Sequence, residues 1–273
     1  MQQSKDIDQQ LDELRRLILG SGATFVGFSD VAGKTGYSFK NLHYAITIGI
    51  RLSDAIIDEI SDKPTYTYFH HYRTVNSLLD QTALRGTLFI QSLGYGAAAV
   101  PASQTVNDVG AQYSAIFPHK TAAVLSGLGC IGKNGLFLHK QYGPRVRLAT
   151  ILTDMPVVSG KTEDHTADSA AGCMTGRGDG NGVPSRRAGA SPEKGGNGAP
   201  EIPSLCLDCD RCVKACPAMA LTGKQWHEGI PRDEIVDAKA CSDYMNSKFK
   251  HIGRGSVCGI CIRVCPVYCR KNT

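Results

Sequence analysis

The first 20 residues have apolar positions at helical spacing. Ile7, Leu11, Leu14 and Ile18 lie three or four residues apart, and charged residues stand between them. This period predicts an amphipathic helix with one apolar face. Gly20 can adopt the left-handed conformation and is expected to end it.

Extended and helical patterns then alternate up to residue 156. Strands are predicted at ATFVGFSDV and YAITIGIRL, which are rich in branched and aromatic residues. A long helix is predicted within YFHHYRTVNSLLDQTALRGTLFIQSLGY, stopping at Gly94, and a short strand at GAAAVPA. HKTAAVLSGLG predicts another helix, and GLFLHKQYGPRVRLATILTD predicts two strands around the turn at Tyr142, Gly143 and Pro144. The pattern favours an α+β protein whose N-terminal domain, residues 1–156, is an α/β sandwich.

Residues 157–204 have a different composition. They include no aromatic residue and are dense in Gly, Ser, Ala and alternating charge. Such a segment buries too little apolar surface to offset the entropy of ordering, so we expect a disordered linker. Cys173 lies inside it and is expected to be an incidental exposed thiol, because nothing nearby could complete a metal site.

The remaining segment, residues 205–273, is dominated by cysteine. A chain of 273 residues can bury a core without disulfides, yet it has 11 cysteines. They crowd into Cys-x-x-Cys steps, which suit metal ligation in a reducing compartment better than a disulfide framework. Zinc ribbons use similar steps, but they do not require the three short intervals and the proline of CLDCDRCVKACP.

The run at Cys206 to Pro217 is typical of bacterial ferredoxins. In those proteins three cysteines bind one [4Fe–4S] cluster and the fourth, before proline, binds the other cluster. Applied here with pseudo-symmetry for CGICIRVCP, the rule predicts a ferredoxin-like module with cluster I on Cys206, Cys209, Cys212 and Cys265.

Cluster II then has Cys216, Cys258 and Cys261, and it needs one more thiolate. Cys241 and Cys269 are the two candidates. Cys241 is favoured, because a ligand N-terminal to the Cys-x-x-Cys pair takes the place of the absent first cysteine. Cys269 would be a spare thiol.

The net charge of +5 is concentrated in this module. Residues 206–273 contain 11 Lys and Arg against 7 Asp and Glu. Two oxidised clusters with their thiolates bring roughly −4, so the surplus favours local neutralisation over a nucleic-acid-binding face.

Arg15 and Arg16 form an arginine pair, but only three apolar residues follow before Gly20. That is too short for a signal peptide, and no window approaches the roughly 18 apolar residues of a membrane span. We expect a cytoplasmic protein without a membrane partner.

Two features together resemble the epoxyqueuosine reductase family. One is the order of a four-cysteine run, an isolated cysteine and CxxCxxxCP; the other is AAVLSGLGCIGKNGLFLHKQYGPRVRLATILTDMPV, Ala122 to Val157, which resembles the GLGWIGKN loop and ILTD strand of that family. The resemblance covers most of the chain apart from the linker. It implies a nitroreductase-like N-terminal domain that binds cobalamin, and two [4Fe–4S] clusters that feed electrons to it for reduction of a modified base in tRNA. Reductive dehalogenases share this plan.

The sequence departs from the family where its catalytic aspartate would stand. Tyr113 occupies that position, and Asp108 is the nearest upstream acid. The departure argues against the tRNA reaction and leaves the catalytic residue unassigned, with Tyr113, His119 and Lys120 as candidates. His70 and His71 lie within the long predicted helix and are expected to be packed or solvated.

In GLGCIGKNG, the family's tryptophan is replaced by Cys130, which we expect to be a small buried residue. The loop has two interpretations. Its glycines could permit close approach of a flat cofactor with two polar contacts, or they could form a tight helix-to-strand connection. The cofactor-binding candidates are Gly127, Gly129, Gly132, Lys133 and Asn134.

These observations predict an iron–sulfur oxidoreductase that takes electrons from a ferredoxin- or flavodoxin-type donor and reduces a small molecule or modified nucleoside. The alternative is a ferredoxin-like electron carrier whose N-terminal domain only docks a partner enzyme. A redox-sensing nucleic-acid binder has only the cationic surplus in its favour.

Overall fold

The N-terminal domain is built on one antiparallel sheet. The structure, a computed structural model, describes residues 2–34, 39, 41–104, 113–157, 163–164, 204–255 and 257–268. The five strands of the sheet follow the order β3-β6-β2-β1-β7. They are β1 (Phe25–Asp30), β2 (Tyr44–Arg51), β3 (Ala97–Val100), β6 (Val146–Thr153) and β7 (Glu163–Asp164). β2 and β6 pair along their whole length, from Tyr44 opposite Thr153 to Arg51 opposite Val146.

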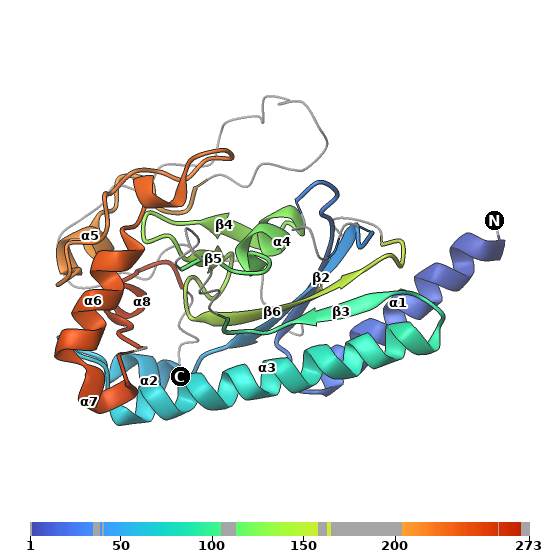
Figure 1. The fold of residues 1–273 in the computed structure, drawn as a ribbon, viewed down its shortest axis with the longest axis horizontal. Coiled ribbons are helices and arrows are strands. Elements are labelled where there is room, and N and C mark those ends of the chain that lie inside the picture. The colour runs from blue at the N-terminus through green and yellow to red at the C-terminus, as the bar shows by residue number, and fades with distance from the viewer. Residues whose placement is uncertain are drawn as a thin grey trace.

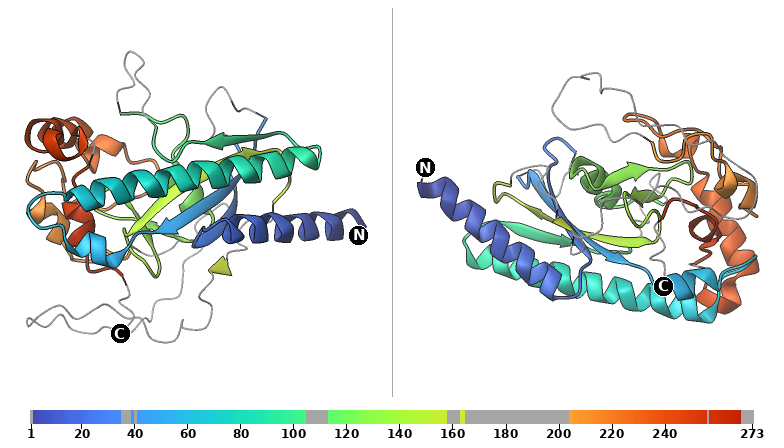
Figure 2. Two further views of the ribbon diagram at one scale, coloured as in Figure 1. Left: turned by 90° about the horizontal axis from the view of Figure 1, so that it is seen from below. Right: turned by 180° about the vertical axis from the view of Figure 1, so that it is seen from behind.

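Two helices cover one face of this sheet, as the pattern of apolar positions predicts. α1 (Gln2–Gly20) and α3 (Tyr66–Ser92) lie side by side across it (Figure 1; Figure 2). Leu14 and Ile18 of α1 are fully buried in the core between the helices and the sheet. Gly86 of α3 permits the close approach, because a Cβ there would stand 2.6 Å from Cδ1 of Ile151 in β6.

The end of α1 corrects one prediction. The helix continues through Gly20, and Gly22 has the left-handed conformation, with φ of +101°. Ser21 and Gly22 donate backbone hydrogen bonds into the last turn, so the helix ends at Gly20 as predicted, but the left-handed residue is Gly22 and not Gly20.

A second layer lies on the opposite face. It consists of α4 (His119–Leu125) and a two-stranded sheet of β4 (Gly129–Ile131) and β5 (Phe137–His139). The two strands predicted around Tyr142 to Pro144 are therefore β5 and β6, but they belong to different sheets. Both edges of β6 are already paired, with β2 and β3, so β5 pairs instead with β4.

The cysteine-rich module lies at one end of the sheet (Figure 1). It contains α5 (Arg211–Ala215), a 3-10 turn at Arg232–Glu234, α6 (Ala238–Lys248), α7 (Lys250–Gly253) and α8 (Ile260–Arg263). It packs on α3 and on α2 (Asp54–Asp58), a short helix that the sequence pattern did not predict. At Gly259, before α8, a side chain would clash with Ile60 and Tyr68.

The antiparallel sheet and the C-terminal module confirm a mixed α and β architecture. Most of the predicted linker, with Cys173, lies outside the described residues, as does Cys269. Among the helices that the structure describes, none is long and apolar enough to cross a membrane.

Candidate iron–sulfur centres and the adjoining loop

Four cysteines from the two ends of the module form a first group. Cys206 and Cys209 lie in a tight turn, in which the Cys209 amide donates to the Cys206 carbonyl at 2.8 Å. Cys212 follows on α5, and Cys265 follows α8. Cys265 interacts electrostatically with the other three thiols, so the structure brings together the four residues predicted for cluster I.

The four residues predicted for cluster II form a second group. Cys216 ends α5, Cys241 lies on α6, and Cys258 and Cys261 lie at α8. Cys261 interacts electrostatically with the other three, and also with Cys212 of the first group. The two groups are therefore adjacent. Cys241 lies with the second group, whereas Cys269 is outside the described residues, so the choice of the eighth ligand stays a prediction.

The donors of both groups are thiols, which are the ligands that iron–sulfur clusters take. Within the part of the chain that the structure describes, no three His, Cys, Asp or Glu residues converge closely enough to hold one metal ion. Cubane ligands are spaced more widely, because four irons and four sulfides lie between them. Burial, and then neighbouring thiols, raise the pKa of Cys258 to about 11, although an Ile260 backbone hydrogen bond opposes the shift. Thiolates at such positions need a cationic partner, which iron would supply.

The loop after α4 contacts the first group directly. The Lys133 amide donates to Sγ of Cys206 at 3.4 Å, and Nζ of Lys133 donates to the carbonyls of Leu207 at 2.8 Å and Cys209 at 3.2 Å. Cys130 is buried beside Cys206 and Cys265, and burial raises the pKa of its thiol. The N-terminal domain thus supplies a backbone donor and a lysine to the turn that carries the first cysteines.

The other residues of this loop make contacts within the chain. A Cβ at Gly129 would lie 2.0 Å from the Leu138 carbonyl oxygen, and one at Gly132 would lie 2.7 Å from the Leu138 side chain. The Asn134 side chain accepts from the Leu136 amide, and Gly127 leaves α4 with φ of +74°.

This geometry is that of the tight connection, the second interpretation of the loop. The chain itself fills the space beside Gly129 and Gly132, so packing explains these two glycines. Cofactor binding at these five residues stays a prediction.

His119 is held on both ring nitrogens. Nδ1 lies 2.8 Å from Oγ1 of Thr150, and Nε2 lies 2.8 Å from the Pro101 carbonyl oxygen. Burial lowers its pKa to about 4, although the Pro101 hydrogen bond opposes the shift. A neutral imidazole with both nitrogens engaged joins β6 to the segment after β3 and is poorly placed to donate a proton.

Lys120 and Tyr113 both interact with Arg232, a residue that no sequence motif had indicated. Lys120 Nζ donates to the Gly135 carbonyl at 2.6 Å, and burial, with a smaller effect from Arg232, lowers its pKa to about 8. Arg232 donates to the Tyr113 carbonyl across 119 residues and interacts with Cys241. Tyr113 has φ of +65°, a left-handed conformation that is uncommon for a residue with a side chain. No local motif could have revealed Arg232, because its neighbours come from the other domain.

Residues 205–268 match the 4Fe-4S double cluster binding domain. The module is therefore similar to domains that bind two [4Fe–4S] clusters.

The relatives are reductases. The tetrachloroethene reductive dehalogenase of Sulfurospirillum multivorans is 27% identical over 183 residues, covering 65% of this chain and 26% of its own length. The epoxyqueuosine reductase of Cyclobacterium marinum is 25% identical over 154 residues, covering 53% of this chain and 34% of its own. The chain thus spans between a quarter and a third of these relatives.

A solved reductive dehalogenase, described as suggesting a mechanism for B12-dependent dehalogenation, shares the fold. Its TM-score is 0.62 at 19% identity, over 95% of this chain and 32% of that one. The homologues of the chain include epoxyqueuosine reductases and reductive dehalogenases, as the motifs indicated.

Proposed function

We propose that this chain is an iron–sulfur reductase with two [4Fe–4S] clusters, which pass electrons from an external donor to a substrate at the N-terminal domain. The observation that carries the proposal is the gathering of eight cysteines into two adjacent groups, against a loop of the N-terminal domain. The ligand assignment is Cys206, Cys209, Cys212 and Cys265 for cluster I, and Cys216, Cys241, Cys258 and Cys261 for cluster II. When bound, the clusters would supply one-electron transfer.

The chain's own residues would set the conditions for this chemistry. The Lys133 amide stabilises negative charge on Cys206 Sγ, an interaction that raises the reduction potential of a bound cluster. Lys120 holds a proton at Nζ up to a pH of about 8, close to Arg232 and to the module. It is the best placed of the three catalytic candidates to donate a proton to a substrate.

The substrate class that we propose is a small molecule or a modified nucleoside. We propose a corrinoid as the cofactor class for the N-terminal domain because a structural neighbour is described as B12-dependent. The N-terminal domain also favours an enzyme over an electron carrier, because an electron carrier needs no five-stranded sheet with a separate second layer.

The first experiment measures the iron and sulfide content of the protein. Anaerobically reconstituted protein should contain about eight iron and eight sulfide per chain, as two cubanes require. Cys241→Ala should leave cluster II with three thiolates, and about seven iron, or about four if that site collapses, with a three-iron electron paramagnetic resonance signal after oxidation. Cys269→Ala is the matched control and should keep all eight.

Two outcomes would contradict the proposal. About four iron per chain in the wild type, or tightly bound zinc, would contradict the assignment of two [4Fe–4S] clusters. Iron loss in Cys269→Ala with retention in Cys241→Ala would reverse the choice of the eighth ligand. The visible spectrum and the cofactor extract of the same preparation distinguish an enzyme with an organic cofactor from an electron carrier with clusters alone.

A further inference from the structure

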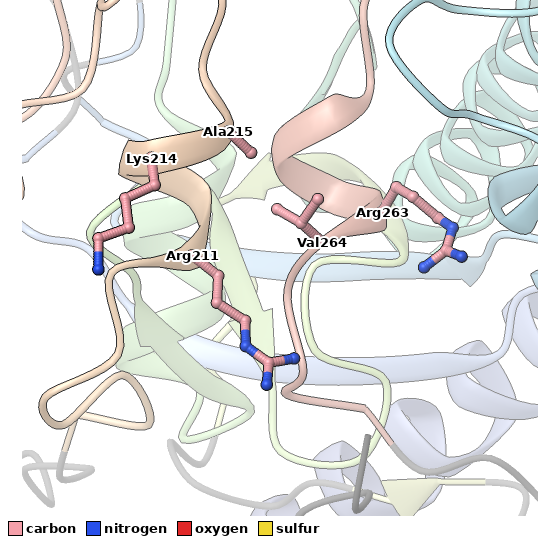
Figure 3. A pocket seen from close by; sticks show the side chains of 5 residues that line it. All are labelled: Arg211, Lys214, Ala215, Arg263 and Val264. Carbon is pink, nitrogen blue, oxygen red and sulfur yellow. The ribbon is translucent and has the colours of Figure 1, made fainter. Parts of the chain in front are cut away.

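An open depression of about 500 Å³ lies between α5 and α8 on the surface of the cysteine-rich module. Arg211, Lys214 and Ala215 line it from α5, and Arg263 and Val264 line it from the α8 segment (Figure 3). Three cationic side chains therefore surround two small apolar ones. Ala215 and Val264 are partly buried against the main core, so the floor of the depression is rigid.

Every residue that lines the depression lies within two positions of a cysteine of the two groups. Arg211 precedes Cys212, Ala215 precedes Cys216, and Val264 precedes Cys265. Lys214 and Arg263 are each two residues from a cysteine of both groups. The depression is thus lined by residues that lie within two positions of cysteines of both groups, so a carrier bound there would lie close to both groups.

The cations are only weakly neutralised. Lys214 lies 2.9 Å from Asp210, but both side chains are at least half exposed, and such pairs contribute little. Arg263 is 3.6 Å from Asp58, which also binds the buried Arg145. Arg211 is exposed and forms no ion pair with the described residues. Cationic side chains therefore face solvent at this point, beside cysteine groups whose clusters would carry negative charge.

We propose that this depression docks a small acidic electron-carrier protein of the flavodoxin type, which delivers electrons to the module. The inference rests on the proposed function and adds to it the place of electron entry. Complementary charge speeds encounter and fixes orientation, while a small apolar floor allows the short contact of a transient redox complex. In each encounter the carrier loses one electron and the protein gains it, and no bond is formed or broken.

The test uses the full reconstituted chain and a purified acidic flavodoxin. Arg211→Glu with Lys214→Glu reverses charge at the depression, and Lys248→Glu with Lys250→Glu makes the same change on exposed lysines elsewhere in the module. Fluorescence anisotropy at low salt measures the Kd for labelled flavodoxin. We expect the first pair to weaken binding about tenfold or more and to flatten its salt dependence, and the second to change it less than threefold.

Because Arg211 adjoins a proposed ligand, Arg211→Gln with Lys214→Gln provides a milder second variant, and iron content is measured for each protein. Stopped-flow reduction by flavodoxin hydroquinone should slow in the same order as binding weakens. Photoreduced deazariboflavin, a small neutral reductant, should reduce all variants equally fast.

Equal effects of the two charge reversals, or none in either, would overturn the docking site. So would a variant that loses affinity for tRNA and keeps its affinity for flavodoxin, because the depression would then be a nucleic-acid contact. If deazariboflavin bleaches no iron–sulfur absorbance in the wild type, the proposed function fails instead, which separates the two conclusions.

Discussion

At the scale of the residue, Lys120 is the side chain whose environment changes its chemistry most clearly. It is a partly buried ammonium group close to a second cation, Arg232, and a single carbonyl at Gly135 accepts from it. Burial first, and Arg232 second, lower its pKa from 10.5 to about 8. The folded protein therefore releases this proton at a lower pH than the unfolded chain does.

Because the pKa of Lys120 differs between the folded and unfolded states, the free energy of unfolding should depend on pH. Between pH 8 and pH 10.5 the unfolded chain binds more protons at this position, so the contribution of Lys120 to stability rises with pH over that window. The substitution Lys120→Met removes this pH-dependent contribution. The free energy of unfolding of the variant, relative to wild type, should fall by up to about 3 kcal/mol as the pH rises from 8 to 10.5.

Anaerobic denaturant titrations at several pH values measure this, with Lys140→Met as the control at an exposed lysine. A constant difference between wild type and Lys120→Met across the window would show that Lys120 is not desolvated.

At the scale of the element, the turn between β5 and β6 supports the last cysteine of the first group. Gly143 has φ of +53°, and a Cβ there would stand 1.3 Å from the carbonyl oxygen of Val267. Val267 is two residues after Cys265, so the turn fixes the path of the chain as it leaves that cysteine. A turn of the N-terminal domain thus also supports the module.

Gly143→Ala should displace the segment after Cys265 and loosen the hold on cluster I. We expect a loss of stability of several kcal/mol, beyond the roughly 1 kcal/mol that a left-handed alanine costs alone. Gly94→Ala is the matched control, because Gly94 has φ of +89° and open space around it.

Iron release to a chelator under anaerobic conditions measures the effect on the cluster, and it should be faster in Gly143→Ala only. Equal release from the two alanine variants would mean that backbone strain, and not the contact with Val267, decides the outcome.

At the scale of the whole molecule, a charged network joins the two domains. Arg145 is 1% exposed and donates to Asp54 at 2.9 Å and to Asp58 at 2.8 Å. Its guanidinium lies 3.8 Å from the ring centre of Tyr268, and Arg263 of α8 reaches Asp58. Since these residues come from both domains, we expect the chain to unfold as one unit.

In Arg145→Met the two domains should no longer unfold in one transition. It leaves two carboxylates without their buried partner, and we expect a loss of about 2–3 kcal/mol, below the cost of a fully buried pair because both acids are about a third exposed. Loss of cluster absorbance should then precede loss of helical circular dichroism on heating, whereas the two coincide in wild type.

Arg147→Met is the control, since Arg147 binds Asn76 and the Ala102 carbonyl within the N-terminal domain. It should lower the transition without separating the two signals. Separation in Arg147→Met, or coincidence in Arg145→Met, would contradict the role of the network.

The sequence by itself determined the features that depend on neighbouring residues. Periodicity located α1, α3 and the central strands, because burial of one face imposes a period of 3.6 or 2 residues. The intervals between cysteines indicated a double-cluster module, because a cluster constrains the spacing of its ligands along a short loop.

Only the tertiary structure decided what depends on distant segments. It placed Arg232 beside Tyr113 and Lys120, and it set the Lys133 loop on the turn at Cys206. It also assigned β5 and β6 to different sheets. Strand partners and contacts between domains depend on the packing of the whole core, so a local sequence pattern does not predict them. The sequence therefore indicated the type of the cysteine-rich module, whereas the surroundings of its cysteines could not be predicted.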